Sequence, residues 1–157
     1  MFFGITPLSK RKEDFMSNLS LFLKGNKKQR ENTKYAATRS LCDENGEPLL
    51  WTIKPLTTKE SEEIRESCTY EVPVKGKANV YHTKIDTSKY LVKLAIASIA
   101  EPNLYSAELQ DSYGVRTPEE LLLAMIDDPK EYSALLEYIN SQNDNESMQD
   151  KIDKAKN

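Results

Sequence analysis

Hydrophobic positions in the second half of the chain recur at the spacing of an α-helix. Residues 87–100 are apolar on almost every side, which predicts a buried central helix that Asp86 caps and Pro102 ends. Residues 106–113 predict a short helix, because Gly114 is a natural residue for the position just after a helix end. The most apolar helix is therefore expected near the middle of the fold.

Two further helices begin with the same signal, a capping residue followed by proline. Thr117 precedes Pro118, and Asp128 precedes Pro129; proline is favoured in the first turn because no helical hydrogen bond needs its missing N–H. The last helix carries side chains at i, i+3, i+4 and i+7 that predict one buried face: Tyr132, Leu135, Leu136 and Ile139. The second half is thus predicted to be helical throughout.

The first half of the chain carries the alternating pattern of β-strands. Residues 35–42 alternate, and the sequence Asp43-Glu-Asn-Gly46 then predicts a turn, since glycine accepts a positive φ. The return strand, residues 49–53, places Trp51 and Ile53 on the same face. Residues 35–56 therefore predict a β-hairpin.

A mostly polar helix is expected next, ending at about Cys68. Thr57-x-x-Glu60 has the spacing of a capping box at its start. Between Cys68 and Asp86 the pattern fits either a second, short hairpin or an extended crossing loop. Together these patterns predict an α+β fold, with an N-terminal β-hairpin region packed against a C-terminal helical bundle.

The chain is expected to form one domain with two tails. Residues 1–33 are predicted to be a flexible N-terminal arm, residues 34–141 a single α+β domain, and residues 142–157 a disordered tail rich in polar side chains. The codons for Lys12-Glu-Asp14 can spell a ribosome-binding site before Met16. We hypothesise that Met16 is a natural start; a native peptide containing Phe2 or Phe3 would contradict this.

Charge is unevenly distributed along the chain. Residues 1–39 hold nine Lys/Arg and three Asp/Glu, a balance of +6, which leaves −9 for the rest of a chain whose net charge is −3. A basic arm on an acidic body raises the alternative of a small DNA-binding regulator. The basic stretch Lys24–Arg30 lacks the aromatic side chains on which bases stack, so a solvated linker is favoured and no nucleic acid is expected.

The residues needed for catalysis or metal binding are scarce. Cys42, Cys68 and the single histidine, His82, are too few for a structural zinc site, which needs about four ligands. The two cysteines are expected to be buried free thiols. Five glycines stand singly, so there is no phosphate-binding loop, and most acids fall at helix starts, where the helix dipole explains them. We expect neither enzymatic activity nor a cofactor.

No membrane or secretion signal is expected. The longest apolar run, Leu91–Ala100, is broken by Lys93 and is too short to span a bilayer. Met1-Phe-Phe3 is followed by no apolar signal-peptide core, so the protein is predicted to be cytoplasmic.

Two groups of side chains are candidates for binding a partner protein. One is the apolar segment Leu19–Leu23, and the other consists of tyrosines, which are enriched in protein interfaces. The candidate residues are Leu19, Leu21, Phe22, Leu23, Tyr105 and Tyr113. For any one tyrosine, a place at the edge of the core is the competing interpretation.

Several short phrases stand in a characteristic order between about Leu19 and Ser141. They are Leu19-Ser-Leu-Phe-Leu23, Asp43-Glu-Asn-Gly-Glu-Pro48, Trp51-Thr-Ile-Lys-Pro-Leu-Thr57, Asp86-x-x-x-Tyr90, Pro102-Asn-Leu104, Leu109-Gln110, Gly114 and Pro118-Glu-Glu-Leu121-Leu-x-x-Met125. Because these segments occur in this order, the chain resembles the XkdN-like tail assembly chaperones of Bacillus-type phages and defective prophages.

The resemblance implies a role in building a phage tail. Such chaperones are expected to bind the tape measure protein, and possibly tail tube subunits, and to keep apolar helical segments soluble until the tube polymerises. The resemblance also implies a protein of the host cytoplasm that is not part of the mature virion. Either the segment Leu19–Leu23 or a groove between the C-terminal helices is expected to engage an amphipathic partner helix.

Overall fold

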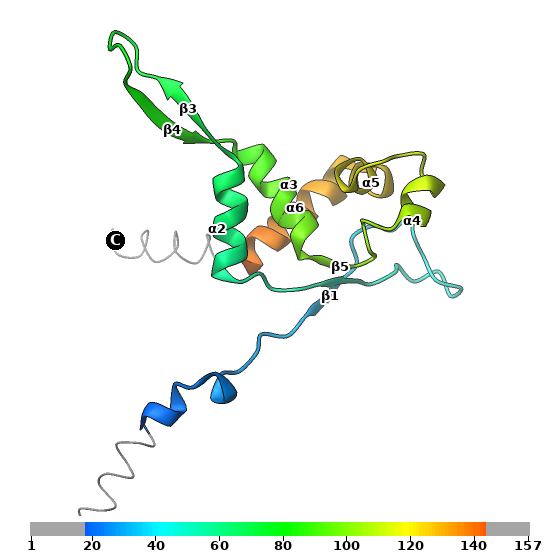
Figure 1. The fold of residues 1–157 in the computed structure, drawn as a ribbon. Helices are drawn as coiled ribbons and strands as arrows, with labels where there is room; N and C mark the ends of the chain where they lie inside the picture. The colour runs from blue at the N-terminus through cyan, green and yellow to red at the C-terminus, as the bar shows by residue number, and fades with distance from the viewer. Residues whose placement is uncertain (1–17, 144–157) are drawn as a thin grey trace, which may run out of the picture. The chain divides into compact units, whose positions relative to one another are not determined.

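A computed structural model describes residues 18–143 of the chain (Figure 1). The chain divides into two units, of which the first ends at Arg30 and the second begins at Glu31. In the first unit, residues 18–21 are helical and are followed by the 3-10 helix η1 (Lys24–Asn26). The hypothesis about Met16, and all but the first two residues of the predicted C-terminal tail, lie outside the described residues.

The second unit contains a three-stranded antiparallel sheet. Its order is β1 (Thr33–Tyr35), β2 (Trp51–Ile53) and β5 (Ile99–Glu101), so β2 is central. Tyr35 is opposite Trp51 across one pair, and Thr52 is opposite Glu101 across the other. All three residues of β2 are buried, so both faces of the sheet are covered at this strand.

The predicted turn of the first hairpin is confirmed, but the ladder is shorter than expected. Gly46 has a φ of +79°, the Asp43 N–H donates to the Glu47 carbonyl at 2.8 Å, and Cys42 bridges to Pro48. Residues 36–41, predicted to continue the strand, instead leave the sheet. The physical reason is a competing partner: Glu131 of a distant helix accepts hydrogen bonds from this segment.

Five helices are described with their bounds. They are α2 (Thr58–Ser67), α3 (Thr87–Ser98), α4 (Ala107–Ser112), α5 (Pro118–Met125) and α6 (Pro129–Gln142). The side chains predicted to cap α2, α3, α5 and α6 all accept a backbone hydrogen bond there, and Thr57 and Glu60 form the full capping box. Local side-chain chemistry therefore fixes where these helices begin.

The predicted end of the central helix was wrong by two residues. Residues 99 and 100 belong to β5 rather than to α3, and the Lys54 N–H donates to the Ser98 carbonyl at 2.7 Å as the chain passes from helix to strand. Pairing with β2 overrides the helical pattern at this point. The α+β class is confirmed, but the sheet takes one strand from the helical half, so a clean division into hairpin and bundle is not observed.

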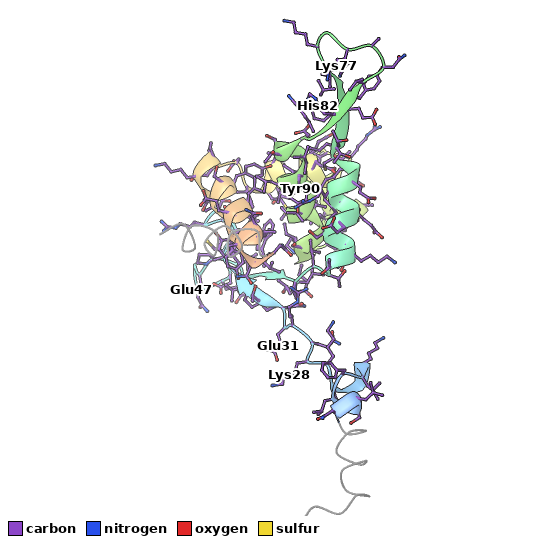
Figure 2. All side chains as sticks on the ribbon, turned by 90° about the vertical axis from the view of Figure 1, so that its left-hand side faces the viewer. Lys28, Glu31, Glu47, Lys77, His82 and Tyr90 are labelled. Carbon is purple, nitrogen blue, oxygen red and sulfur yellow. The ribbon has the colours of Figure 1, made fainter. Side chains whose placement is uncertain are left out.

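Between α2 and α3 the chain forms a second hairpin, one of the two alternatives left open by the sequence. Strand β3 (Thr69–Pro73) pairs with β4 (Tyr81–Ile85), with Val72 opposite His82. The hairpin extends away from the helices, with Lys77 near its tip (Figure 2). Both strands are largely exposed, including His82.

The core of the second unit is built around α3. This helix contacts α2, α5, α6 and β5, and its residues Leu94 and Ala95 are fully buried. Side chains from the other elements complete the core, notably Trp51, Leu121 and Leu135. Within residues 18–143, no helix is both long enough and apolar enough to cross a membrane.

Candidate partner-binding groove

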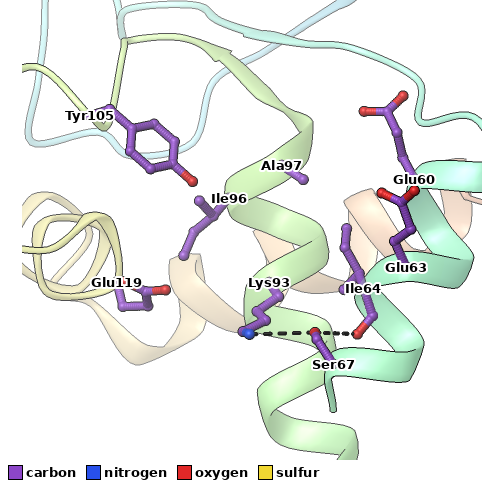
Figure 3. A pocket seen from close by; sticks show the side chains of 9 residues that line it. All are labelled: Glu60, Glu63, Ile64, Ser67, Lys93, Ile96, Ala97, Tyr105 and Glu119. Atoms are coloured by element: carbon purple, nitrogen blue, oxygen red, sulfur yellow. Dashed lines mark hydrogen bonds between the residues drawn. The ribbon is translucent and has the colours of Figure 1, made fainter.

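A groove runs over α3, between α2 on one side and the N-terminal end of α5 and Tyr105 on the other (Figure 3). Its volume is about 440 Å³. It is lined by Glu60, Glu63, Ile64, Ser67, Lys93, Ile96, Ala97, Tyr105 and Glu119. One wall, α2, belongs to the first half of the chain, so this groove differs from the one expected between the C-terminal helices alone.

Helix α2, which forms one wall, has a capped start, a buried end and a contact with α3 between them. At the start of α2, the Thr57 hydroxyl accepts from the Glu60 N–H and the Glu60 carboxylate accepts from the Thr57 N–H. At the far end Cys68 is buried, and between them the Arg65 guanidinium lies 5.7 Å from the centre of the Tyr90 ring. These contacts give α2 a fixed position beside the groove.

The floor of the groove is apolar. Ile96 is buried, while Ile64 and Ala97 are partly exposed and present aliphatic surface to the hollow. Lys93 Nζ donates to Ser67 Oγ at 3.4 Å, and Ser67 Oγ donates to the Ile64 carbonyl at 2.7 Å (Figure 3). The lysine is therefore directed toward α2 rather than across the floor.

Tyr105 stands at the opposite wall as an exposed ring on a fixed backbone. Its side chain is 69% exposed, although the preceding Leu104 is buried. The Tyr105 N–H donates to Asn103 Oδ1 at 3.1 Å, and Gln110 Nε2 donates to the Leu104 carbonyl at 2.8 Å. Of the two tyrosines predicted to bind a partner, Tyr105 is exposed, whereas Tyr113 is half-buried and packs against the core.

Carboxylates outnumber the positive charge around the groove. Glu60, Glu63 and Glu119 line it, against Lys93 alone. Hydrogen bonding from the Thr57 backbone lowers the pKa of Glu60, and Lys54 Nζ lies 3.7 Å from its Oε2. The carboxylate at position 60 is therefore charged at neutral pH, and the groove as a whole is acidic.

The other predicted binding residues lie in the first unit. Leu19, Leu21, Phe22 and Leu23 are all exposed, by between 57% for Leu23 and 86% for Phe22. Four exposed apolar side chains within five residues form the kind of apolar surface that often marks a binding site.

A second, smaller hollow lies between α3 and α6. Its volume is about 240 Å³, and Leu91, Leu136 and Asn140 are among the residues that line it. The Oδ1 atom of Asn140 is buried and has no hydrogen-bond partner among the residues that the structure describes.

The structure corrects one expectation about the cysteines. Cys68 is a buried free thiol as predicted, but Cys42 is exposed, where its Sγ donates to the Arg39 carbonyl at 3.0 Å. In the described part of the chain, no group of three or more Cys, His, Asp or Glu side chains could hold a metal ion.

Residues 19–156 match the family described as the phage XkdN-like tail assembly chaperone protein. The chain belongs to the XkdN-like tail assembly chaperones. The resemblance inferred from the ordered phrases is thereby confirmed, and the family is one of chaperones rather than enzymes.

Two proteins of Bacillus subtilis (strain 168) are similar in sequence to this chain. The phage-like element PBSX protein XkdN is 25% identical over 122 residues, covering 78% of this chain and 81% of the relative. The uncharacterized protein YqbN is 22% identical over 126 residues, covering 80% of this chain and 83% of the relative.

The fold also has a solved counterpart. The crystal structure of YqbN aligns with this chaperone with a TM-score of 0.65 at 18% identity, covering 79% of this chain and 93% of that chain. At this identity the likeness concerns the fold alone.

Proposed function

We propose that this tail assembly chaperone binds the tape measure protein of its phage or prophage and keeps it soluble during tail morphogenesis. The observation that carries the proposal is the match of residues 19–156 to the tail assembly chaperone family. Tail tube subunits are a further possible partner. We place the protein in the host cytoplasm and expect it to leave before the virion is complete.

The mechanism needs only burial of apolar surface. Helical segments with exposed apolar faces associate with one another in water. A soluble partner that covers such a face prevents this aggregation. Exposed side chains that can cover such a face are Leu19, Leu21, Phe22, Leu23 and Tyr105. Tyr113 is half-buried and contributes less surface.

Co-expression with the tape measure protein of the same tail gene cluster tests the function. We expect the tape measure protein to move from the insoluble to the soluble fraction and to co-elute with the chaperone in size-exclusion chromatography. A tape measure protein that is equally soluble alone and does not co-elute would contradict the proposal.

A DNA-binding regulator is the second candidate, and the exposed lysines Lys24, Lys27 and Lys28 favour it. Contacts to phosphate make binding fall steeply with salt, because bound cations are released from the DNA. A titration of a DNA fragment at two salt concentrations separates the candidates. Binding with a steep salt slope supports the regulator, and no binding supports the chaperone.

A further inference from the structure

We propose that the groove over α3 binds a helical segment whose apolar face is flanked by lysine or arginine side chains. The proposal rests on the proposed function and names the chemistry of the tape measure segment that this site recognises. It also assigns Glu63, Tyr105 and Glu119 as residues that determine specificity.

The shape of the groove suits the anchors of one helix face. A volume of about 440 Å³ holds a few side chains spaced i, i+3 and i+4, while the rest of the helix lies above the opening. The aliphatic floor of Ile64, Ile96 and Ala97 matches aliphatic anchors. Tyr105 can cover them from the side, as exposed aromatic side chains often do at the centre of an interface.

The charge of the groove favours basic residues beside the apolar face of the partner helix. Glu60 and Glu63 stand on the α2 wall and Glu119 on the opposite wall, so a helix lying between the walls has carboxylates on both sides (Figure 3). Lys93 keeps its charge but is directed toward Ser67, and Glu60 is paired with Lys54 at 3.7 Å, so Glu63 and Glu119 are the carboxylates that we assign to the partner. Basic side chains beside the apolar face would meet these carboxylates, whereas acidic ones would be repelled.

Charge also disfavours contact between this groove and the acidic body, residues 31–143, of a second copy. Residues 31–143 contain 12 Lys/Arg and 19 Asp/Glu, a balance of −7. Two such bodies repel each other, and the repulsion is strongest where an acidic groove would meet another acidic surface. A segment that carries its own positive charges avoids this cost.

The groove is preformed, so little ordering accompanies binding. The capping box holds the start of α2, and the hydrogen bonds of Asn103 and Gln110 hold the backbone around Tyr105. Walls that are already fixed cost less entropy to immobilise than flexible loops do.

Three labelled peptides test the recognition chemistry by fluorescence anisotropy with the full chain. The first is a designed 18-residue helix with leucines at i, i+3, i+4 and i+7 and flanking lysines. In the second, glutamates replace the lysines; in the third, alanines replace the leucines. We expect the second and third to bind at least about tenfold more weakly than the first, because each lacks one of the two required contacts. Equal binding of the first two peptides would overturn the proposal.

Matched variants of the chain place the binding site. Glu119→Lys and Glu63→Lys should each weaken binding of the leucine–lysine peptide about three- to tenfold, and Tyr105→Ala about tenfold. The controls are Glu120→Lys and Glu62→Lys, which are exposed neighbours on α5 and α2 that do not line the groove. Each control makes the same charge change on the same helix. Controls that weaken binding as much as the groove variants would overturn the assignment.

The same variants separate this proposal from the proposed function. The double variant Glu63→Lys/Glu119→Lys should lose co-elution with the tape measure protein while the double control keeps it. Retained co-elution with lost peptide binding leaves the function standing and overturns the groove as its site. A concentration-dependent dimer that only the groove variants dissociate would show that a second copy is the occupant, which also overturns the proposal.

Discussion

Glu131 joins two parts of the chain that lie 93 positions apart. One carboxylate oxygen accepts from the hydroxyl of buried Thr38 at 2.8 Å, and the other accepts from the Arg39 N–H, also at 2.8 Å. In the sequence Glu131 is explained by its place in the first turn of a helix, and it does lie there. Its second role depends on a partner that no local pattern identifies.

Glu131→Ala should destabilise the fold by about 3 kcal/mol, because hydrogen bonds to a charged acceptor contribute about 1.5–3 kcal/mol each and are only partly additive. Urea denaturation followed by circular dichroism measures the change. Glu137→Ala, an exposed position on the same helix, should stay within about 0.5 kcal/mol. Similar losses for both variants would mean that the contacts with Thr38 and Arg39 do not stabilise the fold.

Glu60 should make stability depend on pH in the acidic range. Hydrogen bonding lowers its pKa in the folded state, so its charge stabilises the fold above the ordinary pKa of glutamate, and this contribution is lost as the pH falls through the lowered value. Wild type should therefore exceed Glu60→Gln in stability at pH 7, and the two should converge in acid. Melting temperatures measured from pH 7 downward test this; a gap that persists in acid would contradict it.

At the scale of elements, the β3–β4 hairpin is the least supported part of the second unit. Its base is attached where the Asp86 N–H donates to the carbonyl of buried Cys68 at 2.8 Å. Beyond the base, side chains such as Tyr70 and Tyr81 remain more than half exposed. An isolated two-stranded hairpin is only marginally stable in water, so it should contribute little to the stability of the body.

Replacing residues 71–83 by Asn-Gly should change the free energy of unfolding by less than about 1 kcal/mol. Tyr70 and Lys84 are paired across the hairpin, so a two-residue turn can connect them. Thermal melts compare the shortened and full chains, and binding of the leucine–lysine peptide serves as a control for an intact groove. A loss of several kcal/mol would show that the hairpin stabilises the body.

At the scale of the whole second unit, α3 organises the packing. Helices from both halves of the chain lie against it, and the strand that follows it completes the sheet. The same helix contributes Lys93, Ile96 and Ala97 to the lining of the groove, and Ile96 also belongs to the core. One element therefore supports both the stability and the candidate binding site.

Leu94→Ala should destabilise the fold by about 2–5 kcal/mol, because it removes a fully buried side chain and leaves a cavity in a packed core. Leu123→Ala on α5 makes the same chemical change at an exposed position and should cost no more than about 0.5 kcal/mol. Chemical denaturation distinguishes the two. Equal small losses would mean that α3 is not the centre of the core.

Part of the candidate site could be predicted from the sequence and part could not. Tyr105 is predicted from the sequence as a partner-binding residue, and it lines the groove with an exposed side chain. Glu63, Lys93 and Glu119 were missed, because charged residues on helices are ordinary surface residues until the helices are packed together. Their shared position depends on the approach of α2 and α5 to α3.

The sequence by itself determined the features that neighbouring residues create. The starts of α2 and α3, the glycine turn at position 46 and the family of the protein all follow from short, ordered stretches of chain. Side-chain caps and positive φ values act over a few residues, so they can be recognised without the fold.

Only the tertiary structure decided where strand pairing replaces helix and which side chains share a site. Ile99 leaves α3 because β2 offers hydrogen bonds to it, and residues 36–41 leave β1 because Glu131 offers others. The groove likewise exists only because α2 and α5 both pack beside α3. These outcomes depend on groups far apart in the chain, whose hydrogen bonds and apolar contacts outweigh the local preference of each segment.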